Sequence, residues 1–173
     1  IDFSTTENVI ALAESINKNF NVFLLINNAG IGGTTRFTDV DTSYITNIIQ
    51  VNVTATSILT HQILANLLKQ PKGYILNVAS MAAFSPIGYK TVYPASKAFI
   101  HSFSRGLSEE LIDTNVSVSV VSPGAMATNK EVTERIEKQG FIGKLTQLDP
   151  DKVAKKCITK LLKRDAVVKV NYL

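Results

Sequence analysis

Short apolar runs alternate with longer amphipathic segments along the whole chain, and this alternation limits the fold more than any other feature. The spacing of apolar residues predicts helices at residues 5–19, 41–69, 93–112 and 149–164. Short apolar runs between them predict strands at residues 22–26, 74–78, 116–121 and 166–170. Strands that alternate with helices of this length form parallel sheets, so we expect an α/β fold with helices on both sheet faces.

The 173 residues contain no internal repeat, low-complexity tract or linker. A chain of this length has room for one domain with its own core, so we expect a single domain over residues 1–173. The run 22–26 is apolar at every position, which is typical of a strand buried on both faces.

The net charge of +4 and the pI of about 9.2 raise the question of nucleic-acid binding. Much of the excess lies in the last predicted helix, where basic residues alternate with an apolar stripe at helical spacing. No aromatic residues lie among them to stack on bases. We therefore interpret the basic residues as one solvated helix face and expect no nucleic-acid partner.

Few residues in the chain can bind a metal or form a disulfide. Cys157 is the single cysteine, and its helical surroundings predict a buried, unreactive thiol. His61 and His101 lie in separate helical segments without a second ligand at suitable spacing, so we expect no metal. No apolar run approaches the roughly 20 residues of a membrane span. The first residues resemble no secretion signal and include no initiator Met. We expect a cytoplasmic protein whose beginning has been removed.

Polar and glycine residues follow three of the predicted strands at the point where each strand ends. They are Asn28–Gly30 after the first strand, Ser80 after the second, and Pro123-Gly124 after the third. Ligands of parallel α/β sheets bind beyond the carboxyl ends of the strands, so we expect these segments to line one crevice.

Tyr93 and Lys97 are four residues apart and therefore lie on one face of their predicted helix. A phenol ordinarily titrates near pH 10, and a neighbouring cation favours its charged form. The pair alone is a weak signal, because many helices carry one by chance. Ser80 at a strand end and Asn52 within the long helix add groups able to hydrogen-bond a reacting oxygen or a water.

Five spaced elements together resemble the short-chain dehydrogenase/reductase family. They are Asn27-Asn28-Ala29-Gly30, Asn52, Ser80, the segment from Tyr93 through Lys97, and the segment from Pro123 through Thr128. They occur in the order of the family, with Ser80 thirteen residues before Tyr93. The resemblance implies an oxidoreductase that interconverts a carbonyl and a secondary alcohol with NAD or NADP.

The resemblance also implies a role for each position. Tyr93 would be the acid/base, and Lys97 would favour its charged form and bind the nicotinamide ribose. Ser80 would hold the substrate oxygen, and Asn52 would support a water chain to solvent. Further cofactor contacts are implied for a set of residues at the strand ends: Asp2, Asn28, Ala29, Gly30, Pro123, Gly124, Met126 and Thr128.

The sequence departs from the family pattern at its start. The family opens with strands and a glycine-rich turn that holds the pyrophosphate, and nothing in the 173 residues corresponds to them. We expect a Rossmann-like doubly wound sheet that lacks its first strands, with the run 22–26 as a bare apolar edge. A truncated enzyme, a fragment that pairs with another chain and an incompetent fragment remain as interpretations. NAD and NADP cannot be distinguished.

Fewer residues indicate the class of substrate and the oligomeric state. Residues 125–148 would form a lid, in which Phe141, Ile142 and Leu145 favour a hydrophobic ketone or alcohol. A catalytically silent dinucleotide-binding protein and an epimerase or dehydratase remain as alternatives. By resemblance we expect a homodimer or homotetramer built on two helices. Apolar residues of these helices could serve both core and contact: Ile58, Leu59, Ile63, Leu67, Phe99 and Phe103.

Overall fold

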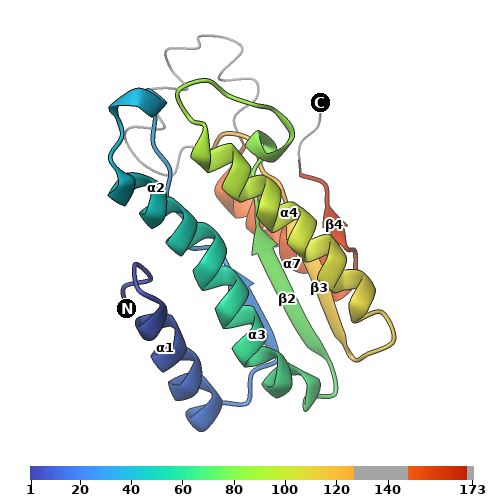
Figure 1. Ribbon diagram of the computed structural model, residues 1–173. Coiled ribbons are helices and arrows are strands. Elements are labelled where there is room, and N and C mark those ends of the chain that lie inside the picture. The colour runs from blue at the N-terminus through green and yellow to red at the C-terminus, as the bar shows by residue number, and fades with distance from the viewer. Residues whose placement is uncertain (127–147, 171–173) are drawn as a thin grey trace.

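The computed structural model describes residues 1–126 and 148–170, and its strands form one parallel sheet in the order β1-β2-β3-β4 (Figure 1). The strands are β1 (Leu24–Asn27), β2 (Gly73–Val78), β3 (Val116–Val121) and β4 (Val167–Val168). All three strand pairings are parallel. The predicted parallel α/β fold is therefore confirmed, although the expected last strand is shorter than residues 166–170.

Helices cover both faces of this sheet, as predicted. The helices are α1 (Thr6–Asn19), α2 (Thr42–Ile49), α3 (Ala55–Leu68), α4 (Val92–Glu110) and α7 (Pro150–Leu162). Helices α3 and α4 pack on one face, with α1 against α3, whereas α7 packs on the other face (Figure 1). The expected helix 41–69 is divided into α2 and α3 by a π-helical turn, Gln50–Thr54, which its spacing did not reveal.

Side-chain caps explain where several helices begin. The Thr5 side chain accepts a hydrogen bond from the Asn8 N–H at the start of α1. Asp41 accepts from the Tyr44 N–H at 2.8 Å and so caps α2. Asp149 accepts from the Asp151 N–H at 2.9 Å, and Pro150 follows at the first turn of α7. Each cap satisfies an amide that has no partner inside its helix.

Apolar core clusters lie on both sides of the sheet, because successive strand residues point to opposite faces. Ile75 packs in the core beneath α3, whereas its neighbour Leu76 packs in the core beneath α7. Cys157 of α7 is buried in the second core, and burial raises the pKa of its thiol. The predicted burial of this cysteine is therefore confirmed.

Strand β1 lies at the edge of the sheet, and the expectation that it is buried on both faces is wrong. Leu25 and Asn27 are buried beneath the helices, but Ile26 on the other face is 45% exposed. Phe23, just before the strand, is 60% exposed. The cause is that α7 packs mainly against β2, β3 and β4, so Leu24 still packs at the margin of its core but Ile26 does not. The expected apolar edge is present.

Candidate active site

The carboxyl ends of β1, β2 and β3 carry the polar segments predicted to form one crevice. Backbone hydrogen bonds join the segments after β2 and β3: the Ala79 N–H donates to Val121 O at 2.8 Å, and the Met81 N–H donates to Pro123 O at 3.0 Å. The side chains described below connect the segment after β1 to α4. The predicted crevice therefore gathers residues that are distant in sequence.

Tyr93 and Lys97 lie in the first turns of α4, and Lys97 Nζ is 6.0 Å from the centroid of the Tyr93 ring. Lys97 is buried, and its ammonium donates a hydrogen bond to Val78 O at the end of β2, at 2.9 Å. Burial lowers the pKa of Lys97 from 10.5 to about 8, because the charged form loses its hydration. A fixed cation is thus present beside the Tyr93 ring.

Asn52 lies in the π-helical turn and is 1% exposed. Its Oδ1 accepts from the Ile31 N–H at 2.8 Å, and its Nδ2 donates to Ile31 O at 2.9 Å. The same Nδ2 also donates to Ser96 Oγ at 2.9 Å. Asn52 therefore fastens the segment after β1 to α4 through its side chain.

Ser96 belongs to the predicted motif, but sequence reasoning gave it no role. Its hydroxyl accepts from Asn52 and donates to Tyr93 O at 2.7 Å. It is buried and so connects the backbone of the acid/base candidate to Asn52. A serine three residues after Tyr93 on the same helix face was the available signal.

Gly30 lies where Lys97 and Asn52 approach the segment after β1. A Cβ at this position would lie 3.1 Å from Lys97 Nζ and 3.3 Å from Asn52 Oδ1. A larger residue would displace one of these two polar groups. The predicted cofactor-binding glycine is therefore in contact with two of the predicted catalytic side chains.

Ser80 lies two residues after the end of β2 and caps the short 3₁₀ helix Met81–Phe84, where its Oγ accepts from the Ala82 N–H at 3.2 Å. A serine hydroxyl that accepts a hydrogen bond can still donate its own proton. Its position at the strand end agrees with the predicted crevice.

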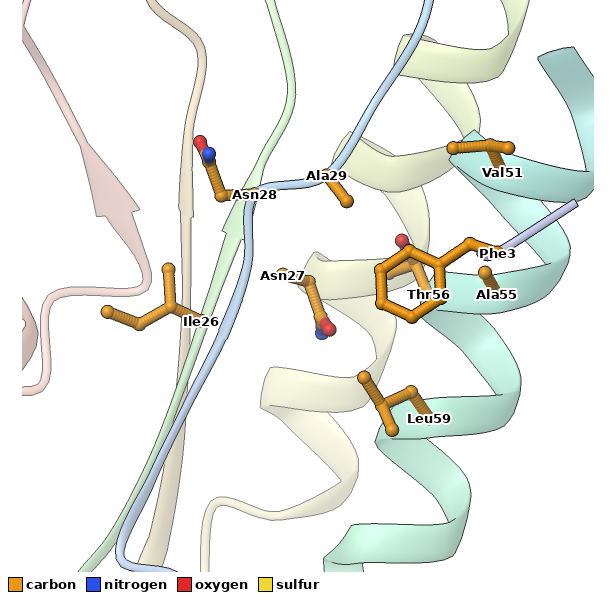
Figure 2. Close-up of a pocket in the computed structure, with 9 residues that line it drawn as sticks. All are labelled: Phe3, Ile26, Asn27, Asn28, Ala29, Val51, Ala55, Thr56 and Leu59. Carbon is orange, nitrogen blue, oxygen red and sulfur yellow. The ribbon is translucent and has the colours of Figure 1, made fainter. Parts of the chain in front are cut away.

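A small pocket of about 60 Å³ lies beside the segment after β1 and is lined by Asn28 and Ala29 (Figure 2). Phe3 lies between this segment and α3 in the same view. Asp2 precedes Phe3 and is exposed, and hydrogen bonds from the side chain and backbone of Ser4 lower the pKa of its carboxyl. Asp2 is thus next to a pocket residue but is not itself part of the lining.

The segment after β3 continues the crevice only in part. Pro123 is buried, and Met126 forms a parallel bridge with Leu148, whose N–H donates to Ala125 O at 3.0 Å. The predicted contact Thr128 and the predicted lid residues Phe141, Ile142 and Leu145 lie outside the described residues.

A buried row of polar side chains crosses the sheet near the site and was not anticipated. Asn27 Nδ2 donates to Thr60 Oγ1 at 2.9 Å and to Asn77 Oδ1 at 2.8 Å. Asn77 Nδ2 in turn donates to Ser104 Oγ at 2.9 Å. This polar row joins β1 and β2 to α3, which directly follows the turn of Asn52, and to α4, which carries Lys97. Only the polar residues inside apolar strands hinted at it.

The apolar residues expected at a subunit contact divide into two groups. Ile63 and Leu67 are fully buried, which confirms the core role expected for them and leaves neither a surface for a subunit contact. Phe99 is 41% exposed and stacks on Phe103 with ring centroids 5.8 Å apart. In the described part of the chain, no helix is long and apolar enough to cross a membrane.

The family model described as short chain dehydrogenase matches residues 1–139. An uncharacterised oxidoreductase of Staphylococcus saprophyticus is 34% identical over 129 residues, which is 74% of this chain and 55% of that protein. A similar oxidoreductase of Staphylococcus epidermidis is 32% identical over 73% of this chain and 56% of its own length. The chain therefore spans about half the length of the curated relatives that it matches.

Solved structures share the fold. A short-chain dehydrogenase from Sphingobium yanoikuyae in complex with NADPH superposes with a TM-score of 0.81 at 24% identity, covering 96% of this chain and 64% of that one. A bulky-bulky ketone specific alcohol dehydrogenase from Comamonas testosteroni gives a TM-score of 0.79 at 24% identity, covering 96% and 62%. At these identities the likeness shows the fold.

Proposed function

Because the chain belongs to the short-chain dehydrogenase family, we propose that it contributes the catalytic part of an NAD- or NADP-dependent oxidoreductase, with Tyr93 as the acid/base. The family membership predicted from the motifs is confirmed by the match over residues 1–139. The reaction proposed is the interconversion of a carbonyl and a secondary alcohol.

The observation that carries this proposal is the position of Lys97. Its buried ammonium is fixed to Val78 O and lies 6.0 Å from the Tyr93 ring centroid. A fixed cation at this place stabilises negative charge that develops on the phenol oxygen while its proton is transferred. In carbonyl reduction, the Tyr93 hydroxyl donates its proton to the substrate oxygen. In alcohol oxidation, the phenolate accepts the proton.

The other side chains hold this pair and the substrate oxygen. Ser80 can donate its hydroxyl proton to the same oxygen, because its Oγ serves as an acceptor for Ala82. Asn52 and Ser96 keep the segment after β1 and the Tyr93 backbone in place through the hydrogen bonds already described. The proton-relay role implied for Asn52 remains a proposal.

The residues at the strand ends fit the ribose and adenosine parts of a nicotinamide dinucleotide. Lys97 uses one of its three protons on Val78 O, so two are left for ribose hydroxyls. Asn28 and Ala29 line the pocket next to Asp2–Phe3, and the absence of a side chain at Gly30 leaves the Lys97 ammonium uncrowded. When bound, nicotinamide supplies or accepts the hydride. No glycine-rich strand-to-helix turn for the pyrophosphate occurs among the 173 residues.

The segment between β2 and α4 supports a hydrophobic substrate. Four of its large apolar side chains are exposed: Met81, Phe84, Ile87 and Tyr89. This segment directly follows Ser80 and directly precedes the helix of Tyr93, so its apolar surface adjoins the groups that bind the reacting oxygen. Ketones or secondary alcohols with an apolar body are therefore the proposed substrate class.

The test measures NADH and NADPH binding by calorimetry, and reduction of hydrophobic ketones, with this chain and with any longer product of its gene. Tyr93→Phe should abolish turnover and leave cofactor binding and the melting temperature nearly unchanged. Tyr74→Phe is the matched control, because Tyr74 lies at the end of β2 that is far from Val78 and the proposed site. Turnover by Tyr93→Phe at the rate of Tyr74→Phe would reject the acid/base assignment. Cofactor binding without turnover by any form would favour a silent binding protein.

A further inference from the structure

The backbone of Gly32 lies directly against the ring of Tyr93. A Cβ on Gly32 would lie 2.8 Å from Cδ2, 3.2 Å from Cε2 and 3.3 Å from Cγ of that ring. Carbon atoms in contact keep about 3.5–4.0 Å between their centres. No side chain fits at residue 32 unless either the Tyr93 ring or the loop moves.

The loop is held on both sides of Gly32. On one side, buried Asn52 binds both the N–H and the C=O of Ile31, at 2.8 and 2.9 Å. On the other side, the Thr35 N–H donates to Tyr89 O at 2.7 Å. Because these bonds are made by residues 31 and 35, the backbone of residue 32 has little freedom to retreat.

Tyr93 is the less constrained partner of this contact. Its backbone C=O is fixed by Ser96, but its ring can rotate about the side-chain bonds. The crowding at Gly32 involves the ring carbons Cδ2, Cε2 and Cγ, so relief requires the whole ring to shift. A substitution at residue 32 therefore displaces the phenol from its position beside Lys97.

We propose that Gly32 is a positioning residue for Tyr93: the absence of a side chain at residue 32 allows the loop backbone to form one wall of the site and sets where the phenol lies. This inference rests on the proposed function for its effect on turnover. Its structural part, the position of the Tyr93 ring, does not depend on the substrate.

The test compares Gly32→Ala with two matched glycine substitutions. Gly106→Ala adds the same methyl group on α4, where no atom lies within 4 Å. Gly33→Ala changes the same loop, but its Cβ would meet Tyr44, nearest the terminal hydroxyl oxygen at 2.5 Å. That hydroxyl is at the far end of a flexible side chain, so Tyr44 can move aside.

Gly32→Ala should lower kcat roughly 100-fold, the loss expected when a reacting group is misplaced by about 1 Å, with the KM for the cofactor and the melting temperature nearly unchanged. Gly106→Ala and Gly33→Ala should retain kcat within a few-fold of the parent. A crystal structure of Gly32→Ala should show a displaced Tyr93 ring beside an unmoved loop. Parent-like kcat, or a loop that shifts while the ring stays, would overturn the inference.

If the parent reduces no ketone, the proposed function fails on its own. Crystal structures of the parent and of Gly32→Ala then still decide the inference. A ring displaced only in Gly32→Ala supports the positioning role, and a ring in the same place in both proteins rejects it.

Discussion

Asn52 holds Ile31 by both of its backbone groups, because its amide accepts from the Ile31 N–H and donates to Ile31 O. The side chain also binds Ser96, so one buried residue joins the segment after β1 to α4. The π-helical turn places Asn52 within an otherwise continuous helix. The arrangement depends on an amide, which donates and accepts at once.

Asn52→Asp should destabilise the protein by about 2 kcal/mol or more at neutral pH, because a buried carboxylate cannot donate to Ile31 O or to Ser96. Burial favours the protonated form of such an aspartate, so the loss should shrink as the pH falls. Urea unfolding at several pH values measures this. Asn47→Asp, at an exposed position of α2, is the control and should change stability little. Equal effects of the two substitutions would contradict the prediction.

Lys97→Met should raise the free energy of unfolding at pH 7 while removing activity. A pKa that falls from 10.5 to about 8 on folding means that burial of the cation costs roughly 3 kcal/mol at neutral pH. Loss of the hydrogen bond to Val78 O destabilises the variant by about 1 kcal/mol. The expected net gain in the free energy of unfolding is therefore about 2 kcal/mol.

The same linkage fixes the sign of the pH dependence of Lys97. Between about pH 8 and pH 10.5 the unfolded chain binds the lysine proton and the folded chain does not, so stability of the parent rises with pH. The stability advantage of Lys97→Met over the parent should therefore fall across this window and be lost by its upper end. Denaturant unfolding at pH 7, 9 and about 10.5 checks it. A constant difference would show that the ammonium is not desolvated.

Asn27→Ala should lower the stability of the protein, whereas Asn28→Ala should weaken cofactor binding, although the two residues are neighbours. Asn27 is buried and donates to Thr60 and Asn77, so its loss leaves buried polar groups without partners and should cost about 1–3 kcal/mol. Asn28 is exposed at the proposed cofactor site, so its substitution should weaken cofactor binding and leave the melting temperature nearly unchanged. Thermal unfolding and cofactor titration of both variants measure this. A reversed pattern would mean that the two roles are misassigned.

Gly106→Ala should stabilise the protein by up to about 1 kcal/mol, because alanine favours a helix interior over glycine. Gly106 lies inside α4, and a Cβ there would meet no atom within 4 Å. Thermal unfolding checks the gain. A lower melting temperature would show that α4 is constrained at this position by something other than helix propensity.

The sequence alone determined the order of elements, the parallel sheet and the family. Apolar periodicity is a local property, so the strand at residues 116–121 was predicted with its observed bounds. Helix geometry places Tyr93 and Lys97 on one face, and the resemblance to the family, not this spacing, suggested their roles. Asn28, Gly30 and Ser80 were found because parallel strands end at one edge of the sheet.

Only the tertiary structure decided which polar groups meet. The π-helical turn at Asn52 and the bonds from Asn27 through Asn77 to Ser104 join residues far apart in sequence, and no local pattern encodes such pairs. The close approach of Gly32 to Tyr93 likewise depends on how a loop is fixed by Asn52 and by Tyr89 O. The exposed face of β1 follows from where α7 packs. Local sequence sets conformational preference, whereas burial and hydrogen bonding between distant segments are settled only when the chain packs.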